Sequence, residues 1–143
     1  MAKNDDNPYV NEISRISKGT EFHGDIISKS DIRVDGVVYG NIITDGKLVV
    51  GDSAEIKNGI IICKSADIWG KIESTIYVEE VLALKATAKY KGEMNLSKLS
   101  IEIGVEFSGS CNILSKDEFK KVKEGQNKLA KKEVKEEAKL NLV

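Results

Sequence analysis

Apolar and polar residues alternate along most of the chain, and the alternation itself recurs as a longer repeat. Six times, a small residue is flanked by apolar residues two positions before and two positions after it. These central residues are Gly24, Gly40, Asn58, Ser74, Gly92 and Gly109, at steps of 16, 18, 16, 18 and 17 residues. An alternation of period two is typical of a strand with one buried face, so the pattern predicts strands and not helices over residues 20–113.

A second set of apolar pairs keeps nearly the same spacing. The pairs are Ile32/Val34, Leu48/Val50, Ala66/Ile68, Leu82/Leu84 and Leu99/Ile101. Each period is then one turn of a coil, whose inward residues are buried only when neighbouring turns stack on it. We therefore predict an all-β, single-domain parallel β-helix, a solenoid of about six turns over 14–115. A polar N-terminal tail, 1–13, and a lysine-rich C-terminal tail, 116–143, are expected to be disordered.

Composition and charge exclude several classes of function. The chain has 22 basic and 23 acidic residues, for a net charge of −1, so no global field favours nucleic acid as a partner. The N-terminus lacks the apolar run of a signal peptide, and no segment approaches the roughly 20 apolar residues of a transmembrane helix. Two cysteines are too few for a secreted disulfide scaffold, which favours a cytoplasmic protein.

Candidate catalytic chemistry is sparse. His23 is the single histidine, and neither Cys63 nor Cys111 has a neighbouring base or the partners of a metal site. No glycine-rich phosphate-binding loop is present, so we expect no cofactor and no enzymatic activity. The alternative is a trimeric enzyme like the left-handed β-helix acyltransferases or carbonic anhydrases. Their strict hexapeptide repeats and shared histidines fit this sequence poorly, and a metal-loaded trimer in solution would favour them.

Three segments carry a resemblance to a known family. They are Ile32-Arg-Val-Asp-Gly-Val-Val-Tyr-Gly-Asn-Ile42, Gly46-Lys-Leu-Val-Val-Gly51 and Ser97-Lys-Leu-Ser-Ile-Glu-Ile-Gly-Val-Glu-Phe-Ser-Gly109. In their order and spacing the chain resembles the bactofilins over about residues 17–114. The resemblance implies a right-handed β-helix that polymerises end to end, without nucleotide, into nonpolar filaments. It also implies that Phe107, as the aromatic residue of the last turn, lies at an end contact.

The same resemblance implies a bacterial cytoskeletal scaffold that organises cell-envelope or cell-shape machinery. Its first partner is then the chain itself, with cell-wall enzymes or other envelope proteins as further partners. Such a scaffold would lie in the cytoplasm, at the inner face of the cell membrane. Many bactofilins bind membrane through a hydrophobic N-terminal peptide, but this N-terminus offers only Met1, Ala2, Tyr9 and Val10 among polar residues.

The ends of the predicted solenoid are its first candidate site. Each end presents unpaired backbone groups above a slice of core, and neither flank supplies an obvious cap. Ile16 and Phe22 in the first turn, with Val105 and Phe107 in the last, are therefore the predicted polymerisation interface. The alternative is that both phenylalanines are ordinary core residues of a terminal turn.

A lateral surface is the second candidate site. The third position after each corner is occupied by Ile27, Ile43, Ile61 and Tyr77, and then by two asparagines. If the alternation continues through the corner, this column faces solvent and offers a partner or bundling surface. If the alternation breaks there, the same side chains belong to the core. Trp69, at an outward position, is either a partner contact or an isolated surface aromatic.

Overall fold

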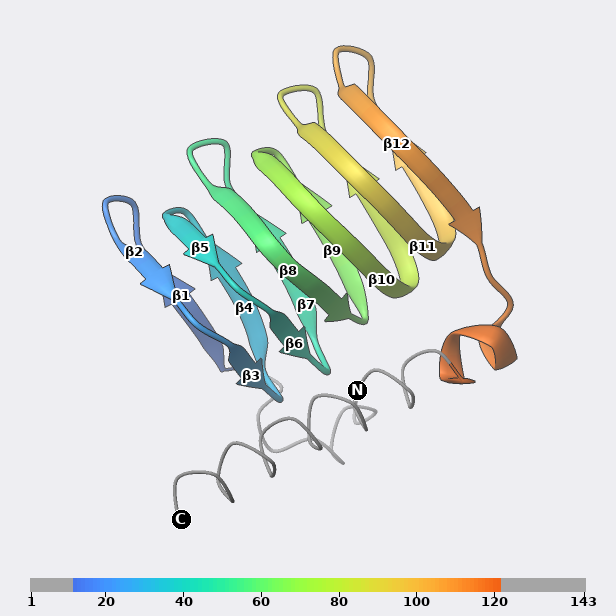
Figure 1. Ribbon diagram of the computed structural model, residues 1–143, viewed down its shortest axis with the longest axis horizontal. Coiled ribbons are helices and arrows are strands. Elements are labelled where there is room, and N and C mark those ends of the chain that lie inside the picture. The colour runs from blue at the N-terminus through green and yellow to red at the C-terminus, as the bar shows by residue number, and fades with distance from the viewer. Residues whose placement is uncertain (1–11, 122–143) are drawn as a thin grey trace, which may run out of the picture.

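The computed structural model describes residues 12–121, which wind into a β-solenoid whose strands form one twelve-stranded parallel sheet (Figure 1). The early strands are short because each corner interrupts the chain, whereas later strands bend through a corner without a break. The strands are β1 (Ile13–Ile16), β2 (Glu21–His23), β3 (Ile26–Ser28), β4 (Asp31–Val34), β5 (Val37–Tyr39), β6 (Ile42–Thr44), β7 (Lys47–Val50), β8 (Glu55–Cys63), β9 (Ser65–Ile68), β10 (Lys71–Leu84), β11 (Lys89–Ile101) and β12 (Glu106–Ile113).

Each turn contributes one segment to each of three sides. β1, β4, β7 and β9 form the first side, which the ends of β10 and β11 continue. β2, β5 and the beginnings of β8, β10, β11 and β12 form the second side. β3, β6 and the later parts of β8, β10, β11 and β12 form the third. The predicted six-turn solenoid is confirmed.

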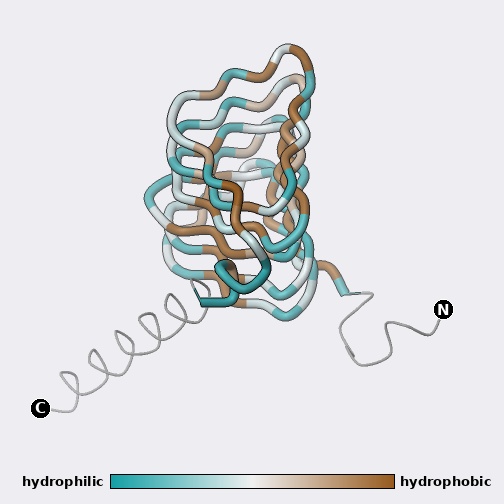
Figure 2. Tube along the Cα trace, turned by 90° about the vertical axis from the view of Figure 1, so that its right-hand side faces the viewer, coloured by the Kyte–Doolittle hydropathy of each residue, from teal (hydrophilic) through white to brown (hydrophobic). Residues whose placement is uncertain are grey.

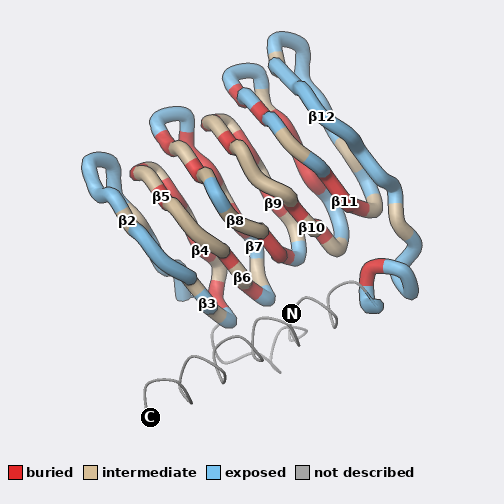
Figure 3. The backbone as a smooth tube through the Cα atoms, in the orientation of Figure 1, coloured by how far each residue is buried: buried red, intermediate tan, exposed pale blue. Residues whose placement is uncertain are grey.

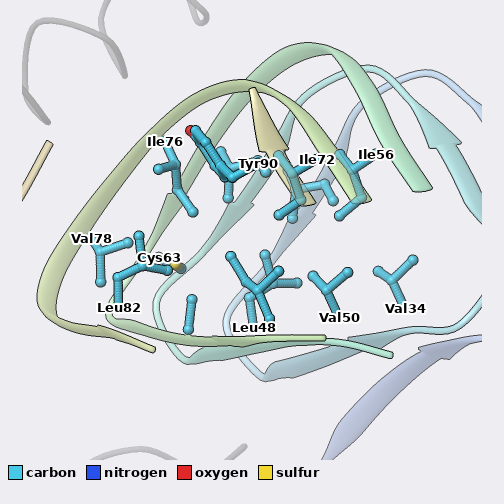
Figure 4. Packing of buried hydrophobic residues seen from close by; sticks show 14 of the residues in the cluster. Val34, Leu48, Val50, Ile56, Cys63, Ile72, Ile76, Val78, Leu82 and Tyr90 are labelled. Atoms are coloured by element: carbon cyan, nitrogen blue, oxygen red, sulfur yellow. The ribbon is translucent and has the colours of Figure 1, made fainter. Parts of the chain in front are cut away.

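The core is a set of stacked apolar columns inside the coil. The alternation of hydrophobic and polar residues along each turn is visible in Figure 2. On the first side, Ile32, Leu48 and Leu82 share one column and are fully buried. Figure 4 shows Ile56, Ile72 and Tyr90 reaching the same interior from the second side. Because every inward position meets its counterpart one turn away, removing a turn would expose its neighbours.

Two kinds of corner join the first side to the second and account for the 16/18 alternation. Long corners at 17–20, 51–54 and 85–88 alternate with short ones at 35–36 and 69–70. Each short corner nests against the long corner one turn before it. A Cβ on Gly70 would lie 2.7 Å from the Ala54 carbonyl oxygen, so only glycine fits there. The last corner, 102–105, is long again. The passage from the third side to the first side is one residue shorter in this turn, from Leu96 to Leu99 against Val78 to Leu82, so the final step is 17 and not 18.

The corner between the second and third sides contains the recurring small residues. Gly24, Gly40, Gly92 and Gly109 all have φ between +133° and +147°, a region that side chains avoid. Asn58 has φ +62°, and the register shifts by one residue just after it. This bulge places one extra residue in the third turn, with consequences for the lateral column described below.

The described chain continues past the predicted boundary at Ser115. Residues 116–121 form a short helix, and the Phe119 side chain is buried although it lies outside the main core cluster. The Ser115 hydroxyl accepts a hydrogen bond from the Glu118 amide, as expected of a residue that caps a helix N-terminus. The remaining predictions for the two tails fall on residues 1–11 and 122–143, outside the described residues.

Candidate functional site: the two end faces

The first turn presents one end face, the first-turn face, formed by Ser14, Ile16, Phe22, Ile26 and Ser28. β1, β2 and β3 each pair with one neighbouring strand, so their outer backbone groups have no strand beside them in the described chain. Ile16, Phe22 and Ile26 pack on the core beneath and stay half-buried. A hollow of about 540 Å³ opens among these three side chains. The face is thus an apolar depression bordered by an unpaired strand edge.

The last turn presents the opposite end face, the last-turn face, formed by Leu99, Ile101, Val105, Phe107, Cys111 and Ile113. Within residues 12–121, β12 pairs only with β11, so its eight residues form a free edge there. The Phe107 ring packs against the Tyr90 ring at a tilt, with ring centroids 5.9 Å apart, yet Phe107 is 39% exposed. Ile101 and Ile113 are 52% and 63% exposed. Side chains that belong by register to core columns are therefore open to solvent at this end.

Burial follows position along the solenoid (Figure 3). The central turns are alternately buried and half-buried, whereas no residue of β12 is buried. In the second-side core column, Val38, Ile56 and Ile72 are fully buried, whereas Phe22 and Phe107 at its two ends are not. The four predicted interface residues thus lie in two pairs, Ile16 with Phe22 and Val105 with Phe107, at opposite ends.

Sequence reasoning missed part of each end face. Ile113 belongs to a third core column, made of Ser28, Thr44, Cys63, Val78, Leu96 and Ile113. The predicted columns include only residues two positions from the small corner residues and those in the preceding apolar pairs, and this column lies outside both sets. Aligning this third column in the sequence would have shown that it begins with the polar Ser28 and ends with the apolar Ile113.

The lateral column is corrected by the register. Ile61 pairs with Ile42 and Ile76 and is fully buried in the core, so its assignment to the outward column is wrong. The bulge at Asn58 moves Ile62 into that place, beside Ile43 and Tyr77. Ile62 is only 1% exposed, whereas Ile27 is 72% exposed. A continuous exposed stripe is therefore absent from the described residues, and the lateral surface stays a hypothesis for Ile27, Ile43 and Tyr77.

Trp69 occupies the second short corner and is half-buried. The Lys85 ammonium lies 5.7 Å from its ring centroid, and its carbonyl accepts a hydrogen bond from the Thr87 hydroxyl. These contacts hold the indole against the next turn, which is a local structural role. A partner contact at Trp69 stays a prediction.

Charged side chains on the outside form ion pairs within and between turns. Lys47 and Asp67 lie 2.7 Å apart on consecutive turns of the first side. Arg33 donates hydrogen bonds to Asp35 at the first short corner, and this contact raises the pKa of the guanidinium. Such exposed pairs contribute little stability each, so the core and the strand ladders hold the solenoid together.

The candidate catalytic residues lie on different strands of the described part of the chain, His23 on β2, Cys63 on β8 and Cys111 on β12. His23 is exposed and stacks on Tyr39, with ring centroids 4.7 Å apart. Within residues 12–121, no group of three His, Cys, Asp or Glu side chains could hold a metal ion. In the same range, no helix is long and apolar enough to cross a membrane.

Comparison with solved structures gives three bactofilins. Double helical filaments of Thermus thermophilus bactofilin match with a TM-score of 0.64 and 27% identity, covering 71% of this chain and 99% of that one. The cytoskeletal bactofilin BacA, determined by solid-state NMR, matches with a TM-score of 0.62 and 23% identity, covering 72% and 97%. A mutant of the Thermus thermophilus protein gives 0.57 and 28%, covering 63% and 99%.

Sequence comparisons point the same way. Curated protein sequences give no significant match. The sequence profile of the Bactofilin family, described as polymer-forming cytoskeletal, matches residues 14–112, nearly the whole solenoid. A six-turn solenoid with open ends, the structural likeness and this match agree, and the chain belongs to the bactofilin family of polymer-forming cytoskeletal proteins.

Proposed function

We propose that this chain assembles end to end through its first-turn and last-turn faces, without nucleotide, into nonpolar filaments. The observation that carries the proposal is that both ends of the described solenoid expose core columns and free strand edges. Each such edge is a template for pairing with another strand. Burying one Phe side chain contributes roughly 1.5–3 kcal/mol, so a junction with several apolar side chains drives association.

Phe107→Arg tests this directly. The Phe107 ring packs against Tyr90 and is part of the last-turn face, so a guanidinium there places a charge in the junction. We expect the variant to keep its β-sheet circular dichroism and to lose filaments in negative-stain electron microscopy. Lys98→Arg, on the outward side of the same turn, is the matched control, and we expect it to keep its filaments. Filaments of normal length from Phe107→Arg would refute the assignment.

We further propose that the filament is a scaffold for cell-envelope or cell-shape machinery at the inner face of the cell membrane, with envelope proteins or cell-wall enzymes as partners. Outward columns of mixed charge run along the solenoid and would repeat along a filament, which supports multivalent recruitment. Pull-down with wild-type filaments and with the Phe107→Arg variant separates the two steps. A partner that binds both equally does not depend on polymerisation.

A further inference from the structure

The two end faces differ in chemistry although they lie in the same columns. On the first-turn face, the inward positions of two columns are Ser14 and Ser28. The Ser28 hydroxyl lies 2.8 Å from that of Ser30, and Ser14 reaches Ser30 at 3.4 Å. This face therefore combines three half-buried apolar side chains with a cluster of hydroxyl groups.

The last-turn face carries hydrocarbon at the equivalent positions. The column that starts at Ser14 ends at Leu99, and the column that starts at Ser28 ends at Ile113. Its other inward side chains are those of Ile101, Val105, Phe107 and Cys111. None of them carries a hydroxyl group or a charge, and a free thiol behaves as a small apolar group.

These differences set the strength of the junction that each face can form. A hydroxyl group must keep its hydrogen bonds when it is buried, and serine offers less apolar area than leucine or isoleucine. A serine-lined face therefore gains less from pairing than an apolar face of the same size. The hollow on the first-turn face further lowers the contact area available to a second copy. The edges differ as well, since β12 offers eight continuous residues whereas β2 and β3 offer three each.

Pairing like with like suits both faces better than pairing one with the other. Two last-turn faces related by a twofold axis bury apolar side chains against apolar side chains. Two first-turn faces can satisfy their hydroxyl groups across the junction. A mixed junction would instead set the serines against Leu99 and Ile113.

Resting on the proposed end-to-end assembly, we propose that the two junctions are unequal and that assembly is hierarchical. Copies of the chain first pair through their last-turn faces into a stable dimer. These dimers then join through the weaker first-turn faces, so the concentration at which filaments appear is set by the first-turn junction. The dimer is the unit that adds to and leaves the filament.

Two variants in one core column separate the junctions. Phe22→Arg blocks the first-turn face and Phe107→Arg blocks the last-turn face, in the same column of the second side. Sedimentation velocity over a range of concentrations measures the association state of each full-length variant. We expect Phe22→Arg to form dimers and Phe107→Arg to stay monomeric at the same concentrations, with dissociation constants at least about tenfold apart.

Each outcome has a separate meaning. Filaments from both variants would refute the proposed end-to-end assembly itself. If neither variant forms filaments, the dimers decide the hierarchy. Equal dimerisation of both variants, no dimers from either, or dimers from Phe107→Arg alone would leave end-to-end assembly standing but overturn the hierarchy. Dimers that appear only when the two variants are mixed would show head-to-tail junctions and overturn it too. If circular dichroism shows that Phe22→Arg unfolds, Ser14→Lys and Ile113→Lys, both at exposed positions, replace the pair.

Exchanging a hydroxyl-bearing and a hydrocarbon side chain at one position of each face gives a positive test. In the Phe107→Arg background, Ser14→Leu makes the first-turn face resemble the last, and we expect dimerisation to strengthen by about tenfold. In the Phe22→Arg background, Ile113→Ser should weaken the dimer by a similar factor. Unchanged dissociation constants in both backgrounds would contradict the proposal.

Discussion

Gly70 lies at the second short corner, nested against the long corner that residues 51–54 form one turn before it. A Cβ at this position would overlap the Gly51 carbonyl oxygen and lie 2.7 Å from that of Ala54. Both oxygens belong to corner backbone that is fixed by hydrogen bonds, since the Gly51 oxygen accepts from the Ala54 amide and the Ala54 oxygen accepts from the Lys71 amide. Neither can swing away as a flexible side chain could. We therefore expect Gly70→Ala to force the second short corner away from the turn below it.

The size of the effect follows from what that displacement disturbs. Overpacking of this kind typically costs about 1–3 kcal/mol. The corner is flanked by two ladder hydrogen bonds, from the Trp69 amide to Val50 at 2.8 Å and from the Lys71 amide to Ala54 at 3.0 Å. Weakening them adds about 1 kcal/mol, and the reduced entropy of the unfolded chain returns about 0.5 kcal/mol. The free energy of unfolding should fall by about 1.5–3.5 kcal/mol.

Urea unfolding in the Phe107→Arg background, where filaments are not expected, measures this change. Circular dichroism follows the whole solenoid, and the fluorescence of Trp69, the only tryptophan, follows the corner itself. Gly19→Ala is the control, since Gly19 lies in a long corner at φ +92° and a Cβ there would have no atom within 4 Å beyond its chain neighbours. It should lose only about 1 kcal/mol. Equal destabilisation by the two substitutions would refute the packing explanation for the alternating corners.

Two other predictions concern the core. Tyr90 is 2% exposed and donates hydrogen bonds to the Ser74 and Glu93 carbonyl oxygens, and burial raises the pKa of its hydroxyl. The neutral hydroxyl thus stabilises the fold below about pH 10, the pKa in the unfolded chain, and this contribution is lost as pH rises further. Tyr90→Phe should lower the free energy of unfolding by about 1–3 kcal/mol at pH 7 and abolish the part of the stability loss above about pH 10 that comes from this hydroxyl. An unchanged urea midpoint at pH 7, or the same dependence of stability on alkaline pH as in the wild type, would contradict this. Ile61→Lys should unfold the chain, whereas Ile27→Lys should keep its thermal midpoint, because Ile61 is buried and Ile27 is 72% exposed. A folded Ile61→Lys protein would contradict the corrected register.

Much of the fold was readable because a solenoid is specified turn by turn. The alternation of apolar and polar residues predicts the strands, and the spacing of the small corner residues predicts the turns. The positive φ values of Gly24, Gly40, Gly92 and Gly109 confirm that the regular spacing of small residues marks real corners. The family resemblance over residues 17–114 likewise agrees with the matched range 14–112.

The lateral column shows where local patterns fail. Counting three residues from each corner assumes that every corner has the same length, but the bulge at Asn58 adds one residue. In a strand, a shift of one residue exchanges the two faces, so Ile61 entered the core and Ile62 took the outward place. Nothing in the alternation of this apolar run, Ile60-Ile61-Ile62, distinguishes the two registers.

The strands, the six turns and the apolar residues of the first and last turns all follow from local sequence, because burial of alternate side chains acts over only a few residues. The folded solenoid was needed to establish which turns use long or short corners, which side chains share a column, and how far each end stays open. Those properties depend on contacts between residues 15 to 19 positions apart, where the backbone of one turn limits the next. Only the register shows that Ser14 shares a column with Leu99, and Ser28 with Ile113, so that the two end faces can be compared position by position.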